Sequence, residues 1–153
     1  MDEAVAALGV ARAHEWRAEG LAQLLLTLQR ELFVVGAELA TALDNASKLE
    51  PSVSKVTDEM VKALESRIDD MVEMSALPDN FVVPGECDSS AALDLARSVV
   101  RRAERAAVAL RRQGQLGDIV PIHYLNRLSD LLFAAARLEE TSRNLAAPPS
   151  RKP

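Results

Sequence analysis

The sequence predicts an all-α domain, an up-and-down bundle of five helices, of which four are long and one is short. Apolar residues recur at intervals of three and four along four long segments, which is the helical period. Nowhere do valines and isoleucines alternate with polar residues over the length of a strand, which argues against a β domain. The 153 residues are 48% hydrophobic and 27% charged, so one domain can bury a core of its own.

The first two predicted helices cover residues 2–12 and 18–43. The first is alanine-rich, and we expect Asp2 to cap it, with Glu3 adding a second negative charge at the positive end of the helix dipole. Gly36 in the second helix costs about 1 kcal/mol relative to alanine, so we expect it to allow the close approach of a neighbour. The second helix carries one heptad-like apolar stripe of Leu21, Leu25, Leu28, Leu32, Val35 and Leu39.

The middle of the chain is predicted to be a polar loop, a third helix and an extended loop. Residues 44–56 are polar and contain a proline, as in a loop, and Thr57 is placed to cap a helix that reaches about Ser75. Residues 76–90 contain two prolines and a glycine around Phe81, so no helix can run through them. The apolar face of the third helix is formed by Met60, Leu64, Ile68 and Met71.

Two further long helices are predicted in the second half. One is capped by Asp88, Ser89 or Ser90 and runs to about Arg112, with Ala92, Leu95, Ala96, Val99, Ala103, Ala106 and Leu110 on its apolar side. The other covers residues 119–142, with Pro121 tolerated in its first turn. Its inward residues are expected to be Leu125, Leu128, Leu131, Leu132, Ala135 and Leu138. The bundle therefore spans residues 1–142, and the proline-rich, basic residues 143–153 are predicted to be a disordered tail.

Charge and cysteine content limit the classes of function. The net charge of −5 argues against a general attraction to nucleic acid or to anionic lipid. A single cysteine, Cys87, excludes an intrachain disulfide and fits a reducing compartment. There is no apolar run of membrane-spanning length, and no basic region followed by an apolar stretch at the start. We therefore expect a cytoplasmic protein.

Metal-dependent and covalent hydrolytic chemistry have little support. His14 and His123 lie far apart and neither stands at metal-ligand spacing from cysteines or carboxylates, so no protein metal site is predicted. Cys87 is flanked by Glu86 and Asp88, which disfavour its thiolate. Neither a phosphate-binding Walker loop nor a nucleophile-elbow motif occurs.

The helix that ends near Arg112 carries an unusual arginine stripe. Arg97, Arg101 and Arg105 are four residues apart and lie on one face, with Glu104 close to the same stripe. Guanidinium groups this close repel one another unless anions meet them, and their planar forks suit phosphate oxygens. Because the whole protein is acidic, the stripe favours a small phosphorylated ligand over nucleic acid. The alternative is a solvated surface held by salt bridges. On the last helix, Asn126 and Asp130 form a polar face: Asn126 could bond a ribose or base and Asp130 could hold an arginine, or the two could belong to a polar network between helices.

Together these segments resemble the PduO-type ATP:cob(I)alamin adenosyltransferases from residue 2 to about residue 138. Asp2 and Glu3 with Ala6 and Gly9 look like the start of the family's first helix, and residues 29–41 look like its second. Residues 81–85 resemble the loop before the arginine helix. The two most specific matches are residues 96–105, which resemble the signature A-R-[TS]-x-x-R-R-x-E-R, and residues 124–133, which resemble a second signature, Tyr-Leu-Asn-Arg-Leu-Ser-Asp-Leu-Leu-Phe.

The resemblance implies a homotrimer of five-helix bundles with ATP bound between subunits. The reaction transfers the 5′-adenosyl group of ATP to the cobalt of cob(I)alamin and releases triphosphate; Mg²⁺ accompanies the ATP. The product, adenosylcobalamin, would serve a cobalamin-dependent mutase. Because cob(I)alamin is itself a strong nucleophile, the protein has to orient the substrates and stabilise the leaving group.

The resemblance also implies roles for individual residues. Arg101, Arg102, Glu104 and Arg105 hold the nucleotide, and Asn126 holds its sugar end. Arg97 pairs with Asp2 of a neighbouring subunit. Phe81 lies against the lower face of the corrin, where it displaces the axial base; without the resemblance, an aromatic residue in such a loop is expected to be a lid on the core.

The sequence departs from the family pattern at two places. It begins at Met1, so we expect it to be an N-terminally truncated member without the Gly/Thr-rich segment whose lysine binds the triphosphate. Glu86 stands where the family commonly has a second glycine, and with Cys87 and Asp88 it puts negative charge near an anion site. Two alternatives therefore stay open: a non-catalytic homologue that binds or delivers cobalamin, and a structural bundle whose arginines form only salt bridges.

Overall fold

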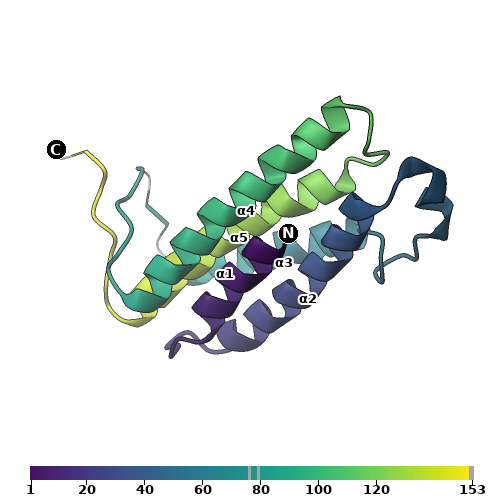
Figure 1. Cartoon of the computed structure of the whole chain (residues 1–153). Helices are drawn as coiled ribbons and strands as arrows, with labels where there is room; N and C mark the ends of the chain where they lie inside the picture. The colour runs from purple at the N-terminus through teal and green to yellow at the C-terminus, as the bar shows by residue number, and fades with distance from the viewer. Residues whose placement is uncertain (76, 79, 152–153) are drawn as a thin grey trace.

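The computed structural model describes residues 1–75, 77–78 and 80–151 and confirms the all-α prediction (Figure 1). Over these residues it contains five α-helices and one short 3₁₀ helix. Two isolated β-bridges also occur, outside any strand. The elements are α1 (Asp2–Arg12), α2 (Leu21–Ala40), η1 (Leu43–Lys48), α3 (Asp58–Met74), α4 (Asp88–Arg112) and α5 (Val120–Ser142).

Both ends of α2 differ from the predicted bounds, residues 18 and 43, for local reasons. The helix begins at Leu21 because Gly20 has φ +80°, a left-handed conformation that glycine adopts without strain. It ends at Ala40, where the hydroxyl of Thr41 donates to the carbonyl of Ala37 at 2.7 Å and Thr41 itself is extended. Residues 44–56 were expected to be a loop throughout, which is wrong for residues 44–48, because they belong to the 3₁₀ helix η1.

The capping predictions were partly wrong. Thr57 caps α3 as expected, since its hydroxyl accepts from the backbone N–H of Met60 at 3.4 Å. Asp2 is already helical and Met1 holds the cap position of α1. Cys87 holds the cap position of α4, so the three predicted caps, Asp88, Ser89 and Ser90, all fall in its first turn. The predicted cap positions of α1 and α4 therefore lie one to three residues after the observed ones, whereas that of α3 is correct.

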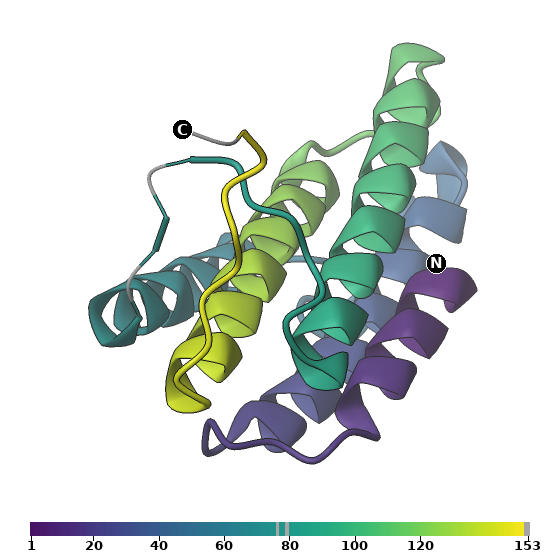
Figure 2. The ribbon, with the colours of Figure 1, turned by 90° about the vertical axis from the view of Figure 1, so that its left-hand side faces the viewer.

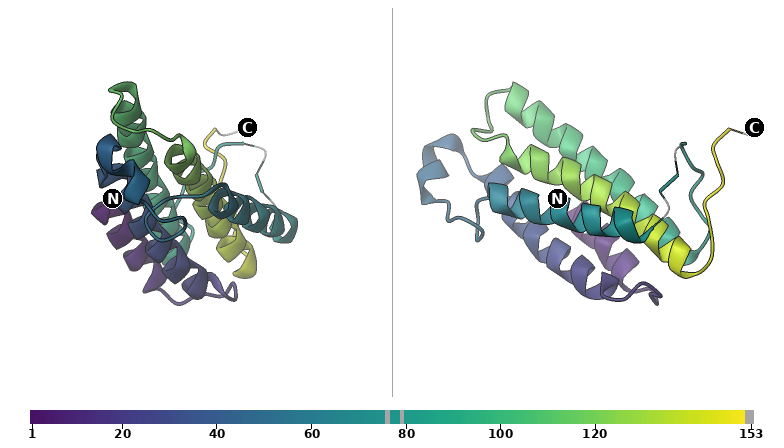
Figure 3. Two further views of the ribbon diagram at one scale, coloured as in Figure 1. Left: turned by 90° about the vertical axis from the view of Figure 1, so that its right-hand side faces the viewer. Right: turned by 180° about the vertical axis from the view of Figure 1, so that it is seen from behind.

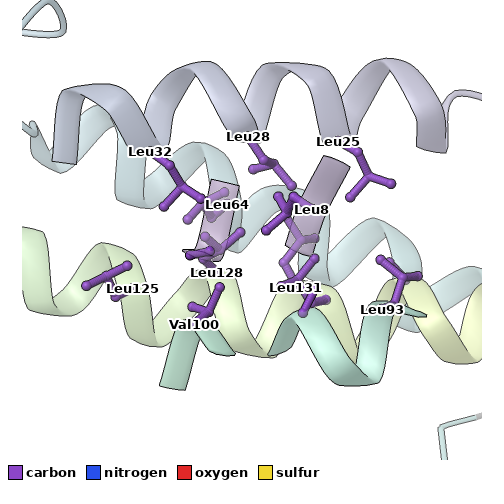
Figure 4. Close-up of a cluster of buried hydrophobic side chains, with 14 of the residues drawn as sticks. Leu8, Leu25, Leu28, Leu32, Leu64, Leu93, Val100, Leu125, Leu128 and Leu131 are labelled. Atoms are coloured by element: carbon purple, nitrogen blue, oxygen red, sulfur yellow. The ribbon is translucent and has the colours of Figure 1, made fainter. Parts of the chain in front are cut away.

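The core lies where the leucine stripe of α2 faces α5 (Figure 4). Leu25, Leu28 and Leu32 are at most 1% exposed, as the heptad-like spacing predicts. The predicted inward residues of α5 are buried as well, except Leu138, which is only partly buried. Side chains from all five α-helices meet here, including Leu8, Leu64, Leu93, Val100, Leu125, Leu128 and Leu131.

The predicted apolar side of α4 is wrong in two places. Leu95 is 61% exposed and Ala106 is also exposed, whereas Leu93, Val100 and Ala107 point into the core. The error has a simple cause: alanines occur around the whole helix and are compatible with either environment, so they fix no face. As a result, α4 leaves apolar residues uncovered on the single chain.

The helices are arranged around α4 and α5, which pack along their length (Figure 2). α1 packs on α4 and α2, and α3 packs along the opposite side of α5 (Figure 3). Between α1 and α2 the side-chain amide of Gln29 donates to the Val5 carbonyl at 3.0 Å, and a Cβ on Gly9 would approach its nitrogen to 3.1 Å. Gly9 therefore makes room for this contact.

The end of the chain runs beside the loop that carries Phe81 (Figure 2). The backbone N–H of Val83 donates to Pro148 at 2.9 Å, and that of Ser150 donates to Phe81 at 2.7 Å. The disorder of residues 143–153, and the division at residue 142, stay predictions from the sequence. No helix in the described part of the chain is both long and apolar enough to span a bilayer.

Candidate functional site

The residues beside the arginine stripe of α4 are already paired within the chain. Arg102, the neighbour of Arg101, forms an ion pair with Glu3 of α1. Glu104 accepts a hydrogen bond from the side-chain amide of Asn126 on α5 at 3.0 Å. Arg101 is half-buried and Arg105 is exposed, and neither has a side-chain partner among the described residues. Two cations thus remain available to an external anion.

A first cavity of about 670 Å³ opens between α1, α2 and the second half of α4, and we call it the α1–α4 cavity. Its lining is almost wholly apolar and includes Phe33, Gly36, Ala103 and Ala106, with Asp2 at one side. Gly36 was expected to allow a close approach, but a Cβ there would lie 3.5 Å from the Cβ of Met1, an ordinary contact. Packing within the chain therefore does not require glycine at this position.

A second cavity of about 580 Å³ lies between α3, α4, α5 and the loop before α4, and we call it the Phe81 cavity. Phe81 is 88% exposed, so the alternative in which it is a lid on the core is wrong. Arg97 lines this cavity, together with Asp130 and the half-buried Phe133. The cavity thus combines two aromatic rings with charged groups at its wall.

Beneath the Phe81 cavity lies a buried ionic cluster that sequence reasoning missed. Arg137 of α5 is 3% exposed, and its Nη2 donates to Asp94 at 2.6 Å and to Glu140 at 3.0 Å. The guanidinium of Arg137 lies 5.0 Å from the ring centre of Phe133, and that of Arg97 lies 5.6 Å from it. Both distances are in the range of cation–π attraction. The predicted inward residues of α5 did not include Arg137, so the sequence carried no signal for this cluster.

A second buried carboxylate, Glu139, joins the end of α5 to the α1–α2 connection. Its carboxylate accepts from the backbone N–H groups of Arg17 and of Ala18, the latter at 2.9 Å. It also accepts from the Ser89 hydroxyl and from Nε of Arg143, the latter at 2.6 Å. Burial raises the pKa of Glu139, but the hydrogen bonds from Ala18, Arg143 and Arg17 outweigh burial and hold the pKa below its ordinary value.

Glu38 shows the opposite balance at the far end of α2. Burial raises the pKa of its carboxyl, and the hydrogen bond that it accepts from the backbone N–H of Val56 at 2.6 Å only partly opposes this. The negative charge of Asp118 raises the pKa further. Glu38 therefore ties the loop before α3 to α2.

Neither histidine belongs to a group of metal-ligating side chains in the part of the chain that the structure describes. His14 lies at a polar cavity of about 440 Å³ with Cys87, Glu15 and Arg143, away from the arginine stripe. Among the described residues there is no group of three or more His, Cys, Asp or Glu side chains that could hold a metal ion.

Several known corrinoid adenosyltransferases are similar to this chain in sequence and fold. A family profile described as cobalamin adenosyltransferase matches residues 1–139. A corrinoid adenosyltransferase of Citrobacter freundii is 40% identical over 147 residues, which are 96% of this chain and 81% of the relative. One from Bacillus subtilis is 40% identical over 78% of this chain, and the match covers 58% of that relative.

The same relationship holds for solved structures. A variant PduO-type ATP:corrinoid adenosyltransferase from Lactobacillus reuteri, complexed with cobalamin and ATP, superposes with a TM-score of 0.88 at 28% identity. The match covers 99% of this chain and 80% of that one. A second variant of that enzyme, complexed with ATP, gives a TM-score of 0.86. The chain therefore belongs to the PduO-type cobalamin adenosyltransferase family of enzymes, whose reaction is the transfer of an adenosyl group to cobalamin.

Proposed function

We propose that this chain is the subunit of a cytoplasmic homotrimer that transfers the 5′-adenosyl group of ATP to cob(I)alamin, with ATP on the arginine stripe of α4 and the corrin in the Phe81 cavity. One observation carries the proposal: Arg97 belongs to the arginine stripe and also lines the Phe81 cavity. The proposed polyphosphate site and the Phe81 cavity are thus adjacent on one helix. This adjacency is what a transfer between the two substrates requires.

The nucleotide site uses the residues that α4 and α5 hold together. Arg101, Arg102 and Arg105 would neutralise the triphosphate, and the Glu104–Asn126 hydrogen bond would fix the amide that meets the ribose. We propose that Mg²⁺ accompanies the ATP and takes its ligands mainly from phosphate and water oxygens.

In the reaction, the electron pair of cob(I)alamin attacks the 5′ carbon of ATP. The cobalt–carbon bond forms as the bond from that carbon to the triphosphate oxygen breaks, and triphosphate leaves with the bonding pair. The protein contributes orientation and charge: the arginines stabilise the leaving group, and the exposed ring of Phe81 excludes water and the lower axial base from the corrin face. The product would pass to a cobalamin-dependent mutase.

A shared site between subunits is supported by two features of the single chain. Asp2 lines the α1–α4 cavity, whereas Arg97 lines the Phe81 cavity, so the two residues serve different cavities of one chain. Phe33 is 66% exposed at the α1–α4 cavity, and Leu95 is exposed on α4, which are apolar surfaces for a neighbour to cover. We propose that Asp2 of one subunit pairs with Arg97 of the next.

The deciding experiment is anaerobic incubation of the protein with Mg²⁺, ATP and chemically reduced cobalamin, followed by absorbance spectroscopy. Conversion of the cob(I)alamin spectrum to that of adenosylcobalamin supports the enzyme. A spectral shift without conversion supports the cobalamin-binding alternative. If neither the spectrum nor ATP binding changes, the arginine stripe is structural.

A further inference from the structure

We infer that Arg137, which lies outside the nucleotide and corrin residues assigned above, is a positioning residue for the corrin: its buried guanidinium sets the orientation of Phe133 and Asp94 in the wall of the Phe81 cavity. The inference rests on the proposed function, because it takes the corrin to occupy this cavity. It adds a residue that would act through two others and touch neither substrate.

The contacts of Arg137 all point to this wall. Its Nη2 holds Asp94 at 2.6 Å, and its guanidinium carbon lies 5.0 Å from the ring centre of Phe133. Asp94 and Phe133 both line the Phe81 cavity, whereas Arg137 does not. Arg137 therefore contacts one acidic and one aromatic side chain of the same cavity without lining that cavity itself.

The charges of the cluster extend this arrangement to Arg97. Arg137 carries one positive charge, and its two partners, Asp94 and Glu140, carry two negative charges, so the cluster has a net charge of −1. Arg97 stands three residues after Asp94 on α4 and approaches the same Phe133 ring. Its positive charge balances the cluster. One buried arginine thus supports both the ring and the neighbourhood of Arg97.

Stability alone is a weak reason to keep such a cluster. Taking charges out of water is costly, and replacing a buried ion pair by apolar residues is often neutral or stabilising. The Nε of Arg137 lies 2.9 Å from Glu140 without the alignment of a hydrogen bond, and its Nη1 has no hydrogen-bond partner among the described residues. The planar guanidinium does, however, combine a fork for Asp94 with a flat face for Phe133, which lysine cannot do.

The end of the same helix provides a control. Arg143, the residue directly after α5, also pairs with a buried carboxylate, that of Glu139, at 2.6 Å. Its surroundings are the α1–α2 connection and Cys87, and it lines a different cavity. Arg143→Lys therefore tests the general effect of weakening an ion pair to a buried carboxylate of α5, without touching the Phe81 cavity.

The test compares Arg137→Lys, Phe133→Leu, their double variant and the control Arg143→Lys. Two properties are measured with ATP present: the dissociation constant for cob(II)alamin, and the fraction of four-coordinate cob(II)alamin seen by electron paramagnetic resonance. We expect Arg137→Lys to weaken cob(II)alamin binding by about tenfold and to lower the four-coordinate fraction, because small misplacements in a site are expensive. The dissociation constant for ATP should stay within about twofold of wild type.

The double variant measures whether Arg137 acts through the ring. If it does, Arg137→Lys adds little to the loss already caused by Phe133→Leu, so the two effects are not additive. The inference is wrong if Arg137→Lys matches Arg143→Lys in both measurements, or if the two losses add fully. If wild type itself neither binds cob(II)alamin nor forms the four-coordinate species, the proposed function fails, and this result differs from a failure of the inference alone.

Discussion

Asn126 on α5 donates its side-chain amide to Glu104 on α4 at 3.0 Å, so the two signature segments of the sequence meet at one hydrogen bond. The two residues are 22 positions apart and each belongs to a different motif. Their contact orients the amide beside the arginine stripe. It also places a negative charge between arginines that would otherwise repel one another.

A first prediction concerns Arg101. Replacing it by alanine should weaken ATP binding by about 1.5–3 kcal/mol, because a charge-assisted bond to phosphate is lost and few contacts within the chain are. Isothermal titration with ATP measures this. Arg112→Ala, at the exposed end of α4, is the control and should bind ATP like wild type. Unchanged ATP binding with a lowered melting temperature would favour the structural alternative.

A second prediction concerns Phe81. Because the ring is 88% exposed, Phe81→Ala should leave the melting temperature and ATP affinity nearly unchanged. It should abolish the four-coordinate cob(II)alamin signal in electron paramagnetic resonance, since the ring no longer keeps the axial base from cobalt. Val53→Ala, at a residue 67% exposed in a distant loop, is the control. Unfolding of Phe81→Ala, or a retained signal, would contradict the assigned role.

A third prediction concerns assembly. Light scattering should report about three times the 16.6 kDa mass of the chain. Phe33→Glu should lower the measured mass toward that of one chain, because a charge then stands in the apolar α1–α4 cavity that we expect a neighbour to cover. Val53→Glu, which introduces the same charge at an equally exposed site, should remain trimeric. A wild-type protein that is monomeric at micromolar concentration would contradict the shared site.

The fold was largely predictable because large leucines specify one face of a helix. The stripe that contains Leu25, Leu28 and Leu32 has no competing arrangement, and α2 buries it as expected. On α4 the apolar residues are mostly alanines and valines spread around the axis, so the sequence did not distinguish Leu93, which is buried, from Leu95, which is exposed. The cap of α4 was misplaced because several polar residues, Asp88, Ser89 and Ser90, stand together at its start and each could serve as a cap.

The candidate site was predictable only where residues follow a motif. The arginines of α4 and Asn126 were found because their order and separation match two specific signatures. Arg137 and Asp94 are 43 residues apart on two helices, and nothing in either local sequence links them. Their pairing, and with it the polar wall below Phe133, follows from the way α4 and α5 pack. That these two charged side chains are buried could therefore be learned only from the structure.

A final prediction uses the two buried carboxylates, whose pKa values move in opposite directions. Hydrogen bonds hold the pKa of Glu139 below its value in the unfolded chain, so its ionised form stabilises the folded state. That stabilisation is complete above the unfolded pKa of about 4.3 and is lost as the pH falls through the lower folded pKa. Burial raises the pKa of Glu38, so its contribution is complete below about pH 4.3 and is lost as the pH rises through the folded pKa.

Glutamine at each position separates the two effects, because it has nearly the same shape and does not ionise. Glu139→Gln should lower the free energy of unfolding at pH 7 by about 1.5–3 kcal/mol, since the charge-assisted bond from Arg143 is lost, and by much less near pH 3. Glu38→Gln should be better tolerated at pH 7 than near pH 3, because the raised pKa of Glu38 means that the wild-type carboxyl loses its stabilising contribution as the pH rises. The amide oxygen of the variant can still accept from Val56. Urea denaturation of wild type and both variants from pH 3 to 7 measures these differences. If the free energy of unfolding of both variants changes with pH in parallel with that of wild type, neither carboxylate has a different pKa in the folded and unfolded states.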